Sequence, residues 1–229
     1  MRKYFISIFM ITVVSLFLSL NISAEEIGEV EIRESEDVFG DFIKVAEIDN
    51  IKVINSSGVI IKNEISERLK NQLELQNYNI VYEILENNNW NLQYSIEDSQ
   101  KDVFGVYSIG STINRTVYEY HLEYDNSGTL RKEWLTDMNI SYRENANGTF
   151  TALSNPSINV TANFGAAFNE EVSSISTGYR YVSGNTGIDF YASYRMRARI
   201  VFPISIGGFE IPIGKWYDWG SVNPTYNLR

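Results

Sequence analysis

Residues 187–202 read GIDFYASYRMRARIVF, and this alternation constrains the fold more than any other feature of the chain. Apolar and aromatic side chains occupy one parity. The other parity is polar and carries three arginines, Arg195, Arg197 and Arg199. Successive side chains of a strand point to opposite faces, whereas on a helix these arginines would spread around the axis. The segment is therefore predicted to be one long strand with an apolar and a basic face.

The rest of the chain indicates further strands that pair with this one. These strands are indicated by alternating or short apolar runs, which are separated by turn signals such as Asp125-Asn126-Ser127-Gly128. Strands are predicted as two short ones or a hairpin within residues 38–61, then at 79–85, 90–96, 103–109, 117–124, 130–142, 158–168, 172–182 and 209–216. One amphipathic helix is predicted at residues 62–77, where Asn63 is a suitable N-cap. The expected fold is a mainly β protein, an antiparallel sandwich or barrel-like structure with one packed helix near the N-terminus.

The N-terminus has the layout of a secretory signal peptide. Arg2 and Lys3 precede an apolar, uncharged stretch at residues 4–20, and residues 21–24 lead to Glu25. Cleavage after Ala24 is expected, which makes the mature protein secreted. The alternative is an uncleaved anchor, for which the apolar stretch is slightly shorter than the ~20 residues of a spanning helix.

The charge is distributed unevenly after the predicted signal peptide. Residues 25–102 carry 18 acidic and 7 basic side chains, and residues 103–229 carry 11 and 10. Residues 25–37 are dense in charge and are expected to be a poorly ordered, acidic lead-in. Residues 38–229 are expected to form one mainly β domain, with an acidic α+β part at 38–102 and a long-strand part at 103–229.

Composition excludes several classes of site. The chain has no cysteine, which excludes disulfides, zinc-thiolate sites and a cysteine nucleophile. The formal net charge of −10 argues against nucleic acid as a partner, because phosphate binding needs a basic surface. No phosphate-binding glycine motif or nucleophile elbow is present, so no cofactor and no catalytic residue is predicted.

The only histidine, His121, lies on a predicted strand. Glu119, His121 and Glu123 share one parity, so long side chains from these positions could converge on a cation. Polar alternation of this kind is also typical of the solvent face of an amphipathic strand. We predict the second arrangement, with His121 at the surface and no metal bound.

Two groups of residues are candidates for binding. The first is the arginine ladder Arg195, Arg197 and Arg199, which suits anionic ligands. Its alternative role is pairing with carboxylates on neighbouring strands, or stacking on tyrosines. The second group is the aromatic cluster Trp216, Tyr217 and Trp219, which suits sugars or a membrane interface. Its alternative role is to close the core of the sandwich.

These patterns predict a secreted, non-enzymatic binding protein that acts at or near a bacterial envelope. The expected partner is an anionic cell-wall polymer, a glycan or a membrane surface. One alternative is a pore-forming or bacteriocin-like toxin, because membrane hairpins need ~9–11 alternating residues per strand. Another alternative is an extracellular carbohydrate-active enzyme, since nothing in the sequence selects a catalytic pair among its 29 acidic residues.

Overall fold

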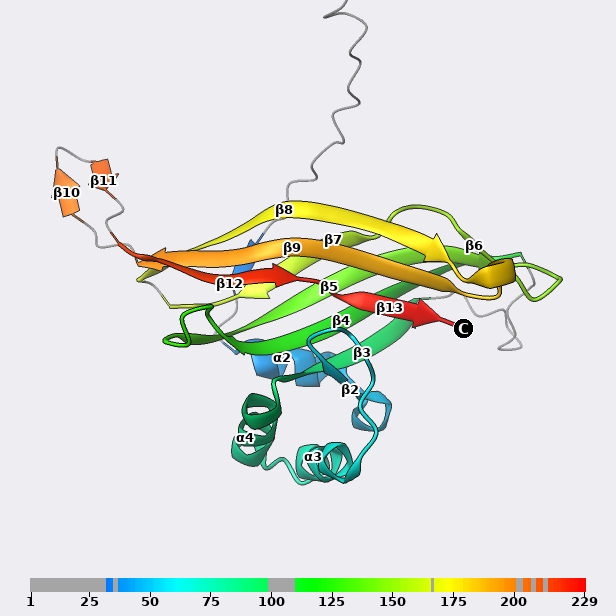
Figure 1. Ribbon diagram of the computed structural model, residues 1–229, viewed down its shortest axis with the longest axis horizontal. Coiled ribbons are helices and arrows are strands. Elements are labelled where there is room, and N and C mark those ends of the chain that lie inside the picture. The colour runs from blue at the N-terminus through cyan, green and yellow to red at the C-terminus, as the bar shows by residue number, and fades with distance from the viewer. Residues whose placement is uncertain are drawn as a thin grey trace, which may run out of the picture.

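The computed structural model describes residues 32–34, 37–98, 110–165, 167–200, 204–206, 209–211 and 214–229. Two β-sheets lie face to face, and helices cover the far side of the larger sheet (Figure 1). This arrangement confirms the predicted fold class, although the described residues form three α-helices where one was predicted. The predicted signal peptide and the predicted strand at 103–109 lie outside the described residues.

The larger sheet has the strand order β1-β7-β5-β4-β3-β2, with β6 also paired to β5. Its strands are β1 (Ile32–Glu34), β2 (Lys52–Asn55), β3 (Trp90–Asp98), β4 (Thr112–Tyr124), β5 (Arg131–Glu144), β6 (Phe150–Ala152) and β7 (Ser157–Ala162). Neighbouring strands are antiparallel except β1 and β7, which run parallel. The predicted turn at residues 125–128 joins β4 to β5, and Gly128 there adopts a φ of 67°.

The smaller sheet is organised around β9, the long alternating strand predicted at residues 187–202. Its strands are β8 (Phe168–Tyr181), β9 (Ile188–Ile200), β12 (Trp216–Val222) and β13 (Thr225–Leu228). β8 pairs with one edge of β9, and β12 and β13 follow each other along the opposite edge. A separate two-stranded sheet contains β10 (Ile204–Ile206) and β11 (Phe209–Ile211).

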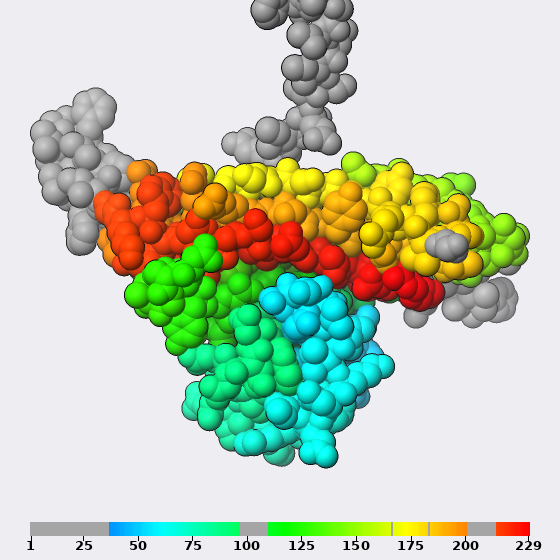
Figure 2. All heavy atoms as spheres, viewed as in Figure 1, coloured from blue at the N-terminus to red at the C-terminus, as the bar shows by residue number. Residues whose placement is uncertain are grey.

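Two hydrophobic cores separate the three layers. The first lies between the sheets and contains the apolar parity of β9, from Ile188 to Ala198, at 0–1% exposure. The second lies between the larger sheet and the helices and includes Phe42, Leu73 and Leu85. The larger sheet is therefore covered on both faces. In Figure 2 the helical part and the smaller sheet occupy opposite sides of the molecule, and the outward side of β9 meets solvent.

The helices depart from the sequence prediction in two places. The predicted helix is confirmed as α3 (Glu64–Glu74), where Asn63 and Ser66 form a reciprocal capping box. The predicted strand at 79–85 is wrong, because α4 (Tyr78–Asn88) buries Val81, Ile84 and Leu85 at helical spacing against the larger sheet. Short 3₁₀ turns occur at η1 (Ile48–Asn50) and η2 (Ser183–Asn185).

Within residues 38–61 the hairpin alternative is supported around the turn at 55–58, where Ile54 of β2 forms an antiparallel bridge to Ile60, whereas the first part of this region is helical. α2 (Val38–Val45) forms there, and β2 is the strand of that region. The Asp37 side chain accepts a hydrogen bond from the Gly40 N–H and caps α2. A Cβ at Gly40 would lie 2.0 Å from that carboxylate, so glycine makes the cap possible. No described helix is long and apolar enough to cross a membrane.

Three more predicted boundaries change. The predicted strand at 158–168 is divided, because β7 ends at Ala162 and Phe168 opens β8 in the other sheet. Gly165, with a φ of 93°, lies where the chain leaves the larger sheet. The predicted strand at 209–216 is likewise divided between β11 and β12. Within the predicted disordered lead-in, residues 32–34 form β1, and most of its other residues lie outside the described ones.

Candidate binding site

The outward side of the smaller sheet is a continuous polar surface, which we call the outer face. Pairing places β8 and β12–β13 on either side of the outward residues of β9. The outer face contains Asn169, Glu171, Ser173, Ser176, Arg180, Asp189, Tyr191, Ser193, Arg195, Arg197, Arg199, Trp216, Asp218, Ser221, Thr225 and Asn227. The helices lie on the opposite side of the molecule and leave this surface uncovered (Figure 1).

Ion pairs organise most of the charge on the outer face. Arg195 binds Asp218, with Nε 3.0 Å from Oδ2, and Arg197 pairs with Glu171. Hydrogen bonds from Arg195 are the main reason that the pKa of Asp218 is lowered. These contacts match the alternative role given to the ladder, because both arginines pair with carboxylates of neighbouring strands.

A second ionic group lies at the other end of β9. Asp189 accepts hydrogen bonds from Arg180 at 3.0 Å and from Arg229 at 2.5 Å. Burial alone would raise the pKa of Asp189, but the two guanidinium groups outweigh burial and lower it. With Arg229 included, five guanidinium groups share this side of the sheet with three carboxylates.

Arg199 differs from its neighbours on β9. Among the described residues it makes no ion pair, and its guanidinium lies 5.3 Å from the centroid of the Trp216 ring. The Arg197 guanidinium lies 4.7 Å from the same centroid. Trp216 is 40% exposed, so one indole is in contact with two cations and with solvent.

The predicted aromatic cluster does not stay together. Trp216 lies on the outer face, whereas Trp219 is 5% exposed and donates a hydrogen bond from Nε1 to the Glu123 carbonyl. Tyr217 is half-buried against Phe168. Trp219 thus has the core-closing role named as the alternative. Adjacent residues of a strand face opposite ways, so the period of two already separated Trp216 from the other two.

The prediction that His121 lies at the surface is wrong, because the residue is 1% exposed between the sheets. Its ring stacks on Trp134 with centroids 5.1 Å apart. Asn91 Nδ2 lies 3.1 Å from Nδ1, and Thr136 Oγ1 lies 3.2 Å from Nε2. An amide nitrogen only donates, so Asn91 is the donor toward Nδ1, and Nε2 faces the Thr136 hydroxyl.

The hydrogen bonds continue from His121 to the smaller sheet. Thr136 Oγ1 lies 2.5 Å from the Tyr194 hydroxyl, which also accepts from Trp134 Nε1 at 2.8 Å. We call Asn91, Gln93, Glu119, His121, Thr136 and Tyr194 the inner polar cluster. Gln93 Nε2 also donates to the Thr225 carbonyl at 2.8 Å. The cluster therefore connects β3, β4 and β5 to β9 and β13.

The carboxylates beside His121 do not converge on one point. Glu119 Oε1 lies 3.8 Å from Nε2, and Glu123 Oε1 lies 3.6 Å from Nδ1, at the other ring nitrogen. Burial raises the pKa of Glu119, which is 4% exposed, and nearby His121 partly opposes that rise. In the described part of the chain, no group of three acidic, histidine or cysteine side chains is arranged to hold a metal ion.

The outer face and the inner polar cluster thus hold most of the residues that the sequence singled out. Of these two regions of the described chain, the outer face is exposed and the inner polar cluster is buried. Sequence reasoning missed Glu171 and Asp218 there, because their position beside the arginines depends on the pairing of strands. Comparisons with known proteins found no matching family model, no similar curated protein and no similar solved structure.

Proposed function

We propose that this chain is an exported, non-enzymatic binding protein that attaches to an anionic cell-wall polymer of a bacterial envelope through the outer face. Export is supported by the positive charges of Arg2 and Lys3, the apolar stretch at residues 4–20 and the Ser23-Ala24 pair before Glu25. Binding is supported by an uncovered sheet face that combines guanidinium groups with an exposed indole.

The excess of cations on the outer face is the observation that carries this proposal. The whole chain has a formal charge of −10, yet five guanidinium groups meet three carboxylates on this side of the smaller sheet. An acidic molecule with one cationic face is oriented by an anionic surface, because local potential governs encounter geometry. The partner is therefore expected to carry phosphate or carboxylate groups.

The ion pairs assign different roles to the three arginines of the ladder. Arg195 and Arg197 are held in place by Asp218 and Glu171, so part of their hydrogen-bonding capacity is already used. Arg199 has no carboxylate partner among the described residues and is the residue with the most capacity left for an anion. A guanidinium can bind phosphate through two parallel N–H groups while its plane rests on an aromatic ring.

The two alternative functions receive less support. The pore-forming alternative depends on long alternating strands at 158–168 and 187–202; the second is β9, but the first is divided between the two sheets. For a carbohydrate-active enzyme, His121 and Glu119 are not reachable as an acid and base pair, because both are buried between the sheets. Neither alternative explains why arginines and an exposed tryptophan share the outer face.

Co-sedimentation with purified walls of a Gram-positive-type bacterium tests the proposal. Walls that retain their phosphate-rich polymer are compared with the same walls after that polymer has been extracted. The protein is expected to bind intact walls, to lose binding as salt rises, and to bind extracted walls poorly. Arg199→Gln is expected to weaken binding about tenfold, as for loss of a hydrogen bond to a charged group.

Arg68→Gln is the matched control, because Arg68 is exposed on α3, on the helical side of the molecule. Equal binding to intact and extracted walls would overturn the proposal, and so would equal effects of the two substitutions. Anionic phospholipid vesicles form a further arm. Preferential binding to vesicles would replace the wall polymer by a membrane, and leakage of entrapped dye would favour the pore-forming alternative.

A further inference from the structure

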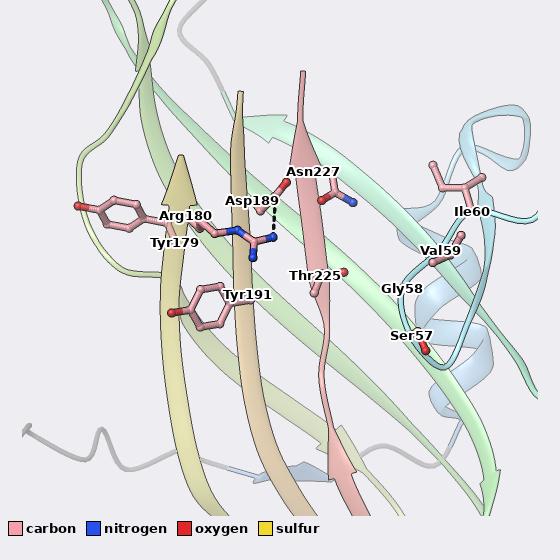
Figure 3. Close-up of a pocket in the computed structure, with 10 residues that line it drawn as sticks. All are labelled: Ser57, Gly58, Val59, Ile60, Tyr179, Arg180, Asp189, Tyr191, Thr225 and Asn227. Carbon is pink, nitrogen blue, oxygen red and sulfur yellow. Dashed lines mark hydrogen bonds and ion pairs between the residues drawn. The ribbon is translucent and has the colours of Figure 1, made fainter. Parts of the chain in front are cut away.

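A groove opens on the outer face at the end of β9 that lies away from Trp216. Its volume is about 930 Å³, and it lies between the smaller sheet and the loop that follows β2. Figure 3 shows the residues of β8, β9 and β13 on one side and residues 57–60 on the other. Ligand pockets typically measure ~300–1,000 Å³, so this groove is large enough for a small molecule or one unit of a polymer.

The groove has an aromatic wall and an aliphatic wall. Tyr191 extends from β9 over β8 in Figure 3, and a Cβ at Gly178 would lie 2.5 Å from its hydroxyl oxygen. The ring therefore rests on bare backbone and is 42% exposed. On the opposite side Val59 and Ile60 are both exposed in the loop. Large apolar side chains in this position leave surfaces that a ligand with an apolar face can cover.

Polar groups lie between these two walls. The Asp189 carboxylate is fixed by Arg180 and Arg229, and its position does not depend on the ligand. Thr225 and Asn227 project from the neighbouring strand, opposite Tyr191 and Asp189. The groove thus offers a carboxylate, a guanidinium, a hydroxyl and an amide, which can donate to and accept from adjacent hydroxyl groups.

The loop that forms the far wall is held in place before any ligand arrives. The Asn55 side chain accepts hydrogen bonds from the N–H groups of Ser57 and Val59 at 3.0 and 2.9 Å. Gly58 has a φ of 74°, and a Cβ there would lie 2.3 Å from Thr225 Oγ1. Glycine therefore lets the loop approach β13 closely. A preformed groove loses little conformational entropy on binding.

We propose that this groove binds a pyranose unit of a polysaccharide. A pyranose ring has an apolar C–H face, which matches Tyr191, and a polar rim of hydroxyl groups, which matches Asp189 and Asn227. The inference rests on the proposed function and names the sugar unit of the wall polymer as the ligand of this groove. Trp216 lies opposite Arg199, eight residues along β9 from Tyr191, or ~26 Å at the usual rise of a strand. An extended glycan chain could therefore contact the groove and the arginine ladder together.

Titration calorimetry with neutral sugars tests the groove separately from the charge of the polymer. The probes are N-acetylglucosamine oligomers and a soluble neutral β-glucan. Binding of at least one probe is expected, and salt should change its affinity little. Tyr191→Ala is expected to weaken binding tenfold or more, while Tyr191→Phe, which keeps the ring, retains most of it. Asn227→Ala is expected to weaken binding by a smaller factor.

Tyr124→Ala is the matched control, because Tyr124 is an exposed aromatic residue at the end of β4 and outside the groove. Failure of every neutral sugar to bind would overturn the inference, as would equal losses in Tyr191→Ala and Tyr124→Ala. The proposed function is read out independently. If salt-dependent binding to intact walls persists without sugar binding, only the groove is wrong, whereas loss of wall binding in the unmodified protein removes the proposed function itself.

Discussion

The inner polar cluster and the outer face both arise from the polar parity of a long strand, yet their surroundings differ completely. Glu119, His121 and Glu123 alternate along β4 as Arg195, Arg197 and Arg199 alternate along β9. β4 is central in a sheet that is covered on both sides, so its polar residues lie between the sheets. β9 belongs to a sheet covered on one side only, so its polar residues meet solvent.

This difference determines what the polar groups contribute. Buried polar atoms have no water to replace a lost partner, so each hydrogen bond of the inner polar cluster matters for stability. The ion pairs of the outer face are partly solvated, and water can replace either partner at little cost. Stability is therefore expected to depend on the inner polar cluster, and binding on the outer face.

The largest effect is expected for His121→Ala. The substitution removes a buried ring that stacks on Trp134, and it takes one hydrogen-bond partner each from Asn91 and Thr136. Cavity formation and unsatisfied polar groups together predict a loss of about 3 kcal/mol in the free energy of unfolding. Urea denaturation measures this loss. A change below ~0.5 kcal/mol, as for an exposed residue, would contradict the burial of His121.

A smaller effect that depends on pH is expected for Glu119→Gln. Burial raises the pKa of Glu119 in the folded protein above its ordinary value of 4.5. This group then contributes stability that is fully present below pH 4.5 and is lost as the pH rises, because the folded protein must ionise a buried carboxyl. Glutamine does not ionise, so the variant avoids the free-energy cost of a buried charge. The variant should gain about 1 kcal/mol relative to the unmodified protein near neutral pH.

Denaturation midpoints of both proteins between pH 4 and pH 8 measure this difference. The gain of Glu119→Gln should grow with pH and vanish near pH 4. A gain that is constant over this range, or that grows as the pH falls, would show that Glu119 is not a buried carboxyl with a raised pKa.

The smallest effect on stability is expected for Arg197→Gln. Its ion pair with Glu171 is partly exposed, and pairs of this kind contribute about 0–1 kcal/mol. Thermal unfolding of Arg197→Gln, Glu171→Gln and the double variant isolates the pair in a mutant cycle. A coupling energy as large as the loss of stability expected for His121→Ala would remove the distinction between the two regions.

The sequence predicted local patterns better than their surroundings. It predicted β9, both of its faces and the capped helix α3, because these depend on spacing within one element. It misassigned α4, since Ile80, Tyr82 and Ile84 also fit a period of two, and packing against the larger sheet decides between the two readings. It placed His121 on the wrong side because Tyr118, Tyr120 and Leu122 resemble a core face, and nothing local shows that both faces are covered.

The candidate site was predictable only in part for the same reason. The three arginines are two positions apart within one segment, so their common face could be predicted from the sequence alone. Their partners Asp218 and Glu171 come from other strands, and the groove needs a loop more than a hundred residues away in sequence from β9. Strand register and loop placement are long-range properties that a single sequence does not specify by pattern alone.

The one parallel pair of the larger sheet sets the order in which that sheet can be completed. Ile32 of β1 pairs with Val160 of β7, 128 positions later, so β1 has no partner until most of the chain has been synthesised. Contacts that close so long a loop form slowly. Until then the outer edge of β7 presents unpaired backbone groups, and such an edge can pair with a strand of another molecule. The edge of β7 is therefore protected against aggregation only after β1, the first described strand of the chain, has paired with it.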